Sequence, residues 1–202
     1  MNELKQTLQA SYTKIADNYF QANHSKYLDT HFEKFFDLVT PNGLVLDAGC
    51  GTGRDTAVFA QHNYQVIGLD LTLAMLAKGK ANEVDTTLVQ ADLEAMPLRR
   101  GFDGIWASAS LLHIPAEKIP FILTEFYNLL NQNGVFYCTV QKGHGARWRR
   151  ISYQKRAKRF FKYWQAESWN SMLEQAGFEI VHEWTDATRT KDWLVRICRK
   201  PS

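Results

Sequence analysis

The apolar positions of the first forty residues recur at helical spacing. Apolar side chains fall three and four residues apart from Leu4 to Tyr19, and again from Leu28 to Val39. Pro41-Asn42-Gly43 then interrupts the pattern, because proline and glycine favour turns. The spacing therefore predicts a helical segment over residues 1–40 that precedes the rest of the fold.

From residue 43 onward, short apolar runs alternate with helical patterns. The runs are Leu44–Leu46, Gln65–Leu69, Thr87–Ala91, Gly104–Ala107 and Val135–Val140. The clearest helical pattern lies between the last two runs, with apolar positions from Ile119 to Leu130 on one face. Short strands separated by helices favour a mostly parallel sheet that is covered on both faces.

The C-terminal part of the chain has a different pattern. A helix is predicted near Glu167–Ala176, with Gly177 as its C-terminal cap. Two β-like runs follow, Glu179–Trp184 and Trp193–Cys198, and we expect them to close the sheet as a hairpin. We find no linker or repeat in the sequence, and we interpret residues 1–202 as one α/β domain with a helical cap (1–40), a core (43–140) and a substrate side with closing strands (141–202).

Composition narrows the class of protein. The chain has 202 residues, of which 45% are hydrophobic and 22% charged, as in globular domains. It contains no apolar run of the roughly 18–20 residues that a membrane span needs. The N-terminus lacks the apolar core of a signal peptide, and three widely spaced cysteines suit a reducing compartment. We therefore expect a cytoplasmic protein with no membrane partner and no metal site.

The charge is unevenly distributed. Residues 1–140 hold ten Lys or Arg against fifteen Asp or Glu, whereas residues 141–202 hold fourteen against six. Nine of the basic residues lie between Lys142 and Lys162, with no acidic residue among them. Such a segment attracts anions, although a solvated helix face is an equally good interpretation of the pattern.

Three of the predicted strands end in an aspartate, namely Asp47, Asp70 and Asp92. Ligands of open α/β sheets bind outside the carboxyl ends of the strands, where these side chains would meet. The first aspartate is followed by Ala48-Gly49-Cys50-Gly51-Thr52-Gly53, whose glycines let the backbone approach a ligand closely. The second acid lies about twenty residues further on, where it can accept hydrogen bonds from a ribose diol.

The spacing of the glycines argues against a phosphate-binding turn. A dinucleotide-binding loop G-x-G-x-x-G would need glycine or alanine where this chain has Arg54, and no Lys-Ser or Lys-Thr pair marks a phosphate loop. The acid ahead of the glycines disfavours phosphate but suits a cation. The pattern therefore predicts a pocket for a nucleoside with a positive, phosphate-free tail, a shape that S-adenosylmethionine has.

These segments resemble the class I S-adenosylmethionine-dependent methyltransferases, in particular their type 11/25-like small-molecule branch. Val45 to Gly53 resembles motif I of the family, Val66 to Thr72 the acidic loop that follows, and Gln90 to Pro97 the segment beside the adenine. The resemblance is continuous from about residue 43 to 140. It implies a three-layer α/β sandwich with a seven-stranded, mostly parallel sheet whose last strand is antiparallel.

The resemblance also implies roles for single residues toward S-adenosylmethionine. Gly49, Gly51 and Gly53 would pass under its methionine part, and Asp47 would lie near its amino group, directly or through water. Asp70 would hold the ribose hydroxyls.

Further residues are implied around the adenine and the sulfonium. Asp92 would accept from the adenine amine while Leu93 and Leu71 contact the ring, and Ser108 would lie near the sulfonium. Tyr19 is a candidate to fold over the cofactor, although core packing explains it equally well.

The methyl acceptor is less clearly marked. His113 is the best-placed candidate for a general base, with a structural role as the alternative; Tyr12, Arg147 and Arg150 are candidates to contact the acceptor. We favour a small-molecule acceptor. The alternatives are RNA or a protein bound through the basic segment 142–162, and a non-catalytic, cofactor-binding regulator or partner subunit.

Overall fold

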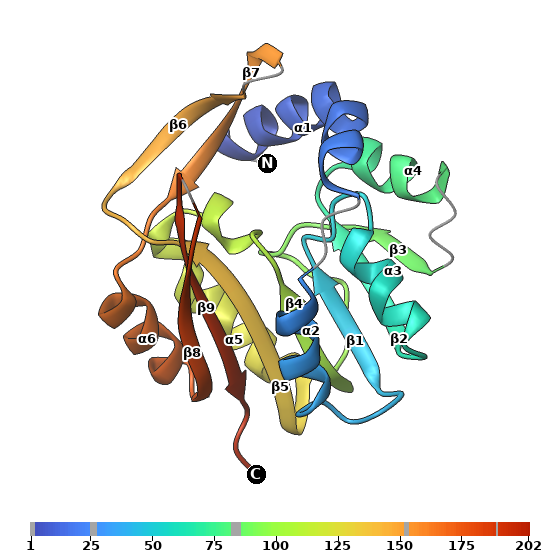
Figure 1. Cartoon of the computed structure of the whole chain (residues 1–202), viewed down its shortest axis with the longest axis vertical. Coiled ribbons are helices and arrows are strands. Elements are labelled where there is room, and N and C mark those ends of the chain that lie inside the picture. Colours follow the sequence, from blue (N-terminus) through green and yellow to red (C-terminus); the bar gives the residue numbers. More distant parts are fainter. Residues whose placement is uncertain (1–2, 25–27, 82–85, 152–153, 189) are drawn as a thin grey trace.

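A seven-stranded sheet with the strand order β3-β2-β1-β4-β5-β9-β8 forms the centre of the molecule (Figure 1). The structure is a computed structural model that describes residues 3–24, 28–81, 86–151, 154–188 and 190–202. Neighbouring strands from β1 to β5 pair in parallel, and β9 is antiparallel to both β5 and β8. The strands of this sheet are β1 (Leu44–Ala48), β2 (Gln65–Asp70), β3 (Thr87–Gln90), β4 (Phe102–Ala107), β5 (Leu130–Gln141), β8 (Glu179–Ala187) and β9 (Asp192–Arg199).

Alternate side chains of the strands enter two separate cores, as the twofold period of a strand requires. Trp106 and Tyr137 stack at 3.5 Å between ring centroids on one face, where they meet Phe32 of α2 (Asp29–Phe36) and Phe59 of α3 (Arg54–Gln61). Their neighbours along β4 and β5 point to the other face. Both faces are thus buried, which explains the nearly continuous apolar runs.

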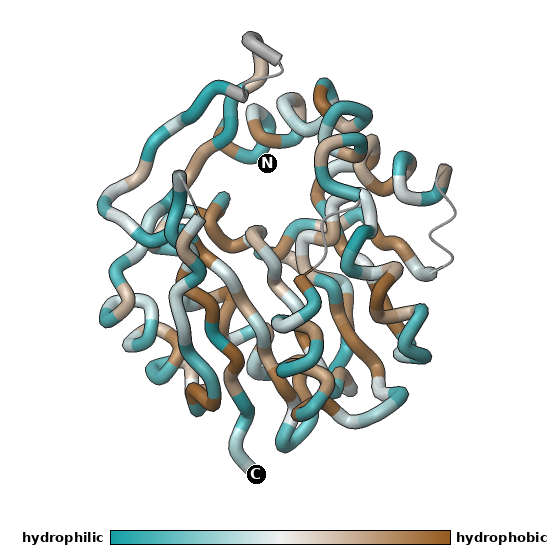
Figure 2. The backbone as a smooth tube through the Cα atoms, in the orientation of Figure 1, coloured by the Kyte–Doolittle hydropathy of each residue, from teal (hydrophilic) through white to brown (hydrophobic). Residues whose placement is uncertain are grey.

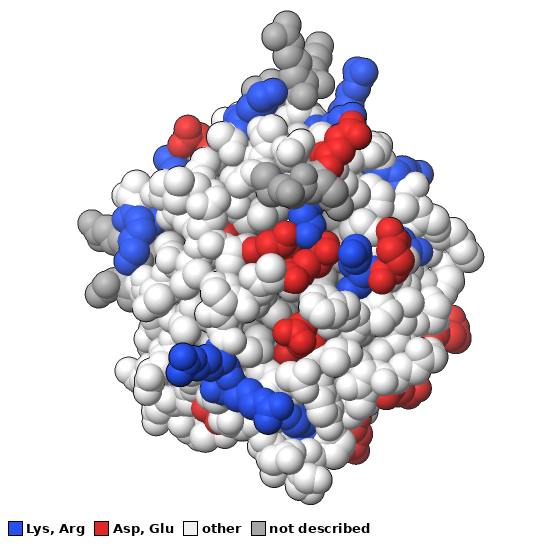
Figure 3. Space-filling view, turned by 180° about the vertical axis from the view of Figure 1, so that it is seen from behind, with Lys and Arg blue, Asp and Glu red and all other residues white. Residues whose placement is uncertain are grey.

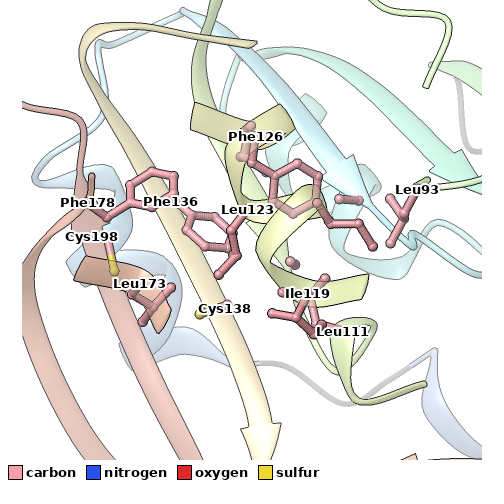
Figure 4. Close-up of a cluster of buried hydrophobic side chains, with 14 of the residues drawn as sticks. Leu93, Leu111, Ile119, Leu123, Phe126, Phe136, Cys138, Leu173, Phe178 and Cys198 are labelled. Carbon is pink, nitrogen blue, oxygen red and sulfur yellow. The ribbon is translucent and has the colours of Figure 1, made fainter. Parts of the chain in front are cut away.

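The opposite face is covered by α5 (Ile119–Leu129) and α6 (Ala166–Gln175). Figure 4 shows Leu123 and Phe126 of α5 directed toward Phe136 of β5. The same core takes in Leu173 of α6. Helices on both faces make the predicted three-layer sandwich, so this prediction is confirmed.

The C-terminal segment also folds as the pattern predicted. Gly177 has φ +96° directly after α6, a left-handed conformation that favours glycine and ends the helix. β8 and β9 form the expected hairpin, and β9 inserts between β5 and β8. The antiparallel last strand is therefore confirmed.

The basic segment forms a separate two-stranded antiparallel sheet, β6 (Ala146–Ile151) and β7 (Gln154–Lys162). Its interpretation as a helix face is wrong, because cross-strand pairing places Trp148 opposite Phe160 and Arg147 opposite Phe161. Figure 2 shows mainly hydrophilic colours along β6, in contrast to the hydrophobic central strands.

The first helix lies across the carboxyl edge of the sheet. α1 (Glu3–Asn23) lies between α4 (Leu73–Ala81) and the β6–β7 hairpin (Figure 1). Lys78 of α4 pairs with Asp17 at 2.7 Å, and Ser11 Oγ accepts a hydrogen bond from the backbone N–H of Lys158 in β7 at 3.2 Å. The predicted N-terminal helical segment therefore covers the edge of the sheet at which the aspartates at the strand ends lie.

Strand β5 is longer than predicted. It begins at Leu130, directly after α5, because Leu130 pairs with Phe102. The register then shifts, and Asn133 adopts φ +62° within this irregular stretch. The polar run from Asn131 to Asn133 hid this beginning from the apolar pattern. None of the described helices is long and apolar enough to cross a membrane.

Candidate active site

A cavity opens at the carboxyl ends of the parallel strands, under α1. Its space measures about 850 Å³ when the part that is open to solvent at the mouth is included. Its walls come from α1, from the loops after β1, β2 and β3, and from the segment after β4. Of the predicted site residues it is lined by Tyr12, Tyr19, Gly49, Gly51, Asp70, Leu71, Asp92, Leu93, Ser108 and His113.

The glycine loop after β1 keeps part of this cavity open. Gly51 adopts φ +57°, and a Cβ there would lie 3.4 Å from Met75 Cε and 3.8 Å from Tyr19 Cε1, both of which are cavity residues. Gly49, at φ +84°, has no room at all, because its Cβ would come within 2.4 Å of Ser110 Cβ. Gly53 does not line the cavity but precedes α3 with φ +76°.

Asp70 is fixed by the backbone of two loops. Its Oδ2 accepts from Gly51 N–H at 3.0 Å and its Oδ1 from Thr72 N–H at 2.8 Å. Burial raises the pKa of Asp70, while these backbone hydrogen bonds act in the opposite direction. Each carboxylate oxygen has a further lone pair, so the group can accept additional hydrogen bonds from a ligand in the cavity.

Asp92 is held by an N-terminal lysine that the sequence analysis did not identify. Lys5 Nζ lies 2.6 Å from Asp92 Oδ2 and 2.7 Å from Glu94 Oε1. Although burial lowers the pKa of Lys5, the hydrogen bonds and charges of Asp92 and Glu94 raise it above its ordinary value. Lys5 shares the helical period of Leu8 and Tyr12, which was the signal that could have placed it at this site.

Asp47 is separated from the cavity. Its side chain is only 2% exposed, and its Oδ2 accepts from Thr56 Oγ1 at 2.6 Å. Burial, with the nearby Asp55 carboxylate, raises the pKa of Asp47 to about 8. Arg54 pairs with Asp55 at 2.5 Å, so it acts as a partner for a neighbouring acid.

His113 and Tyr12 form a hydrogen-bonded pair in the cavity wall. His113 Nδ1 lies 2.6 Å from the carbonyl oxygen of Phe160 in β7, and a carbonyl only accepts, so this nitrogen carries the proton. The Nε2 atom then accepts from the Tyr12 hydroxyl at 2.7 Å. Burial lowers the pKa of His113 to about 3, which keeps the imidazole neutral at physiological pH.

Ser110 is a second cavity residue that the sequence analysis missed. Its hydroxyl oxygen is buried and makes no hydrogen bond to the described residues. Ser108, two positions earlier, was singled out because it ends the fourth strand. Ser110 follows the same strand, but nothing in a serine's sequence context signals an unpaired hydroxyl.

The two predicted arginines lie away from the cavity. Arg147 projects from β6 and donates from Nε to the Tyr163 hydroxyl at 3.2 Å. Arg150 is exposed on the same strand, opposite Lys158. Across the described part of the chain, no group of His, Cys, Asp and Glu side chains is placed to hold a metal ion.

The chain is similar to several methyltransferases. A family model described as a methyltransferase domain matches residues 20–183. The malonyl-[acyl-carrier protein] O-methyltransferase of Enterobacter lignolyticus is 31% identical over 122 residues, which cover 57% of this chain and 48% of that protein. The trans-aconitate 2-methyltransferase of Deinococcus radiodurans is 36% identical over 107 residues, which cover 52% and 40%. The chain thus matches only about half the length of these relatives.

A solved structure with the same fold comes from Burkholderia thailandensis. It is 1,6-didemethyltoxoflavin-N1-methyltransferase with bound 1,6-didemethyltoxoflavin and S-adenosylhomocysteine. It superposes with a TM-score of 0.77 at 21% identity, covering 98% of this chain and 88% of that one. Because the methyltransferase family model spans residues 20–183, well over half of the sequence, and the fold superposes on a solved methyltransferase, the chain belongs to the class I S-adenosylmethionine-dependent methyltransferase family.

Proposed function

We propose that this chain binds S-adenosylmethionine in the cavity under α1 and transfers its methyl group to a small acceptor that carries a carboxylate. The observation that carries the proposal is the convergence of the glycine loop, Asp70 and the Tyr12–His113 pair on one cavity. The cofactor supplies a methyl group on a sulfonium, which an acceptor atom displaces in line when the two are held close.

The residues present fit this cofactor. Asp70, already fixed by two backbone N–H groups, has lone pairs left for the two ribose hydroxyls. Gly51 leaves the space that a Cβ would fill beside Tyr19, as a close-lying methionine part requires. Leu71 and Leu93 offer apolar surface to an adenine ring, and Asp92 lies in the same part of the wall.

Asp47 and Gly53 act on the cavity from outside its lining. Since Asp47 is buried against Thr56, an amino group in the cavity would reach its charge only through the loop backbone or a water molecule. Gly53 sets the turn into α3 and thereby the course of the loop. Both residues are proposed to shape the cofactor site, and Ser108 lines it directly.

We propose His113 as a base only for an acceptor that must lose a proton, and its geometry limits how it can act. Only Nε2 can accept a proton, and the Tyr12 hydroxyl already donates to that atom. Tyr12 Oη is therefore the atom that we propose to face the acceptor, with His113 behind it. The low pKa of His113 makes it a weak base, which favours an acceptor that is already ionised at neutral pH, such as a carboxylate.

The named relatives support the same acceptor class. One acts on a malonyl group carried by acyl-carrier protein and another on trans-aconitate. RNA bound through the hairpin is the alternative acceptor, and the experiment below compares it directly with the small acids. On the face seen in Figure 3, acidic side chains gather near the centre, and a band of basic side chains lies below them.

Calorimetric titration tests cofactor binding. We expect micromolar affinity for S-adenosylmethionine and S-adenosylhomocysteine, and none for NAD or ATP. Transfer of labelled methyl to a panel of di- and tricarboxylic acids then tests the acceptor class, with a tRNA pool as comparison. No binding of either cofactor form would refute the proposal, and binding without transfer to any acceptor would favour a regulatory partner subunit.

A further inference from the structure

A second hollow lies at the base of the β6–β7 hairpin, outside the cofactor cavity. It measures about 770 Å³ with the part open to solvent included, and it lies between the end of β5, the hairpin and residues 188 and 190–192. A cluster of Leu112, Phe161 and Tyr163 separates the two spaces, since Ala109 of the cavity wall packs against this cluster and Tyr163 lines the hollow.

The wall of the hollow contains a buried amide without a partner. Gln141, the last residue of β5, is 2% exposed and lines the hollow. Its Nε2 atom makes no hydrogen bond to the described residues. This nitrogen is closed to solvent, so it lies behind the surface of the open hollow and offers no donor to a ligand there.

Positive charge converges on the same place. Arg147 and Arg149 are two residues apart on β6, so their side chains share one face of the strand, and both line the hollow. No ion pair joins either of them to an acid among the described residues, and Asp192 is the one acidic residue found in this lining. Lys142 adds a further positive charge.

The pKa of Tyr163 reflects the positive charge of these arginines. Its hydroxyl accepts from Arg147 Nε at 3.2 Å. Burial raises the pKa of this phenol. The hydrogen bonds from Arg147 and Arg149 and the charges of these two residues lower the pKa by a larger amount, so that the net shift is downward. Two guanidinium groups thus stabilise negative charge at this point.

We propose that the hollow is a binding site for the oxyanion group of a small molecule, a carboxylate or a phosphate, with Arg147 and Arg149 as its donors and Lys142 as a further cation. Guanidinium groups match the planar or tetrahedral oxygens of such groups through paired N–H donors. The site is separate from the cofactor cavity, and it does not depend on the function proposed above.

Titration of isotope-labelled protein tests the site. Inorganic phosphate and succinate, each added at constant ionic strength with chloride as comparison, distinguish the two ligand sources. We expect a saturable shift of the Arg147 and Arg149 side-chain N–H signals with at least one of them. In the double variant Arg147→Gln/Arg149→Gln, affinity should fall at least tenfold.

The controls separate a built site from general surface charge. Arg150→Gln removes a charge from the same strand outside the hollow and should change affinity less than twofold. Gln141→Met keeps the volume and leaves the arginines in place, and it should change affinity less than twofold. Asp70→Asn, which alters the cofactor cavity, should leave phosphate binding unchanged. Shifts no larger than with chloride, or equal affinity in the double variant and Arg150→Gln, would overturn the proposal.

Discussion

Replacement of Asp70 measures how much of the cofactor affinity rests on one carboxylate. Asp70 accepts two backbone hydrogen bonds, and we propose that it accepts two more from a ribose diol. A hydrogen bond to a charged group contributes about 1.5–3 kcal/mol. Asp70→Asn keeps one acceptor oxygen and loses the charge, so we expect a loss of about 1.5 kcal/mol, or roughly tenfold in Kd.

Asp70→Ala removes both ribose contacts and also frees the N–H groups of Gly51 and Thr72. We expect a loss of about 3 kcal/mol, or more than a hundredfold in the Kd of S-adenosylhomocysteine. Calorimetric titration measures both variants, with urea unfolding to verify that they fold and Asp37→Ala, an exposed acid, as the matched control. Affinities of both variants within twofold of the unaltered chain, with an intact fold, would show that Asp70 does not hold the cofactor.

Three further predictions concern stability. Gly49→Ala should cost about 3 kcal/mol, because its Cβ would overlap Ser110, whereas Gly145→Ala, at φ +70° with nothing within 4 Å, should cost only about 1 kcal/mol of backbone strain. If urea unfolding gave equal losses of unfolding free energy for the two variants, this would contradict the close approach of Gly49 to Ser110. Lys5→Met should destabilise the protein by about 2 kcal/mol, since it leaves the partly buried Asp92 without its cation and Glu94 with only Lys118 at 3.5 Å, while Lys118→Met, 48% exposed, should cost under about 0.5 kcal/mol. His113 has a folded pKa of about 3, below the unfolded value of about 6.5, so its contribution to stability is present above pH 6.5 and is lost as pH falls toward 3. The stability difference between the unaltered chain and His113→Gln should therefore shrink by about 2 kcal/mol from pH 6.5 to pH 5, and a constant difference would refute the neutral, buried imidazole.

The local sequence pattern was sufficient to predict the parallel strands and the main turns of this protein. Apolar runs that end at Asp47, Asp70 and Asp92 predicted parallel strands, because a strand buried on both faces must be apolar along its whole length. The sequence predicted turns at Gly51 and Gly177, because only glycine readily adopts the left-handed backbone conformation that both residues have. The order of these signals along the chain already implied the family.

The tertiary structure decided what those residues face. The sequence pattern treats Asp47 and Asp70 alike, but only the packing of Thr56 against Asp47 removes it from the cavity. The basic segment has no period strong enough to distinguish a helix from a hairpin, and its contact with α1 joins residues far apart in the chain.

The sequence pattern could not predict contacts between residues that are far apart in the chain. Lys5 meets Asp92 across 87 positions, and Tyr12 meets His113 across 101. The hollow lined by Gln141, Arg147 and Arg149 exists only because the end of β5 and the hairpin meet in the fold. Sequence determines local geometry through short-range sterics and burial, whereas protonation, pairing and access to ligands follow from which distant groups the fold brings together.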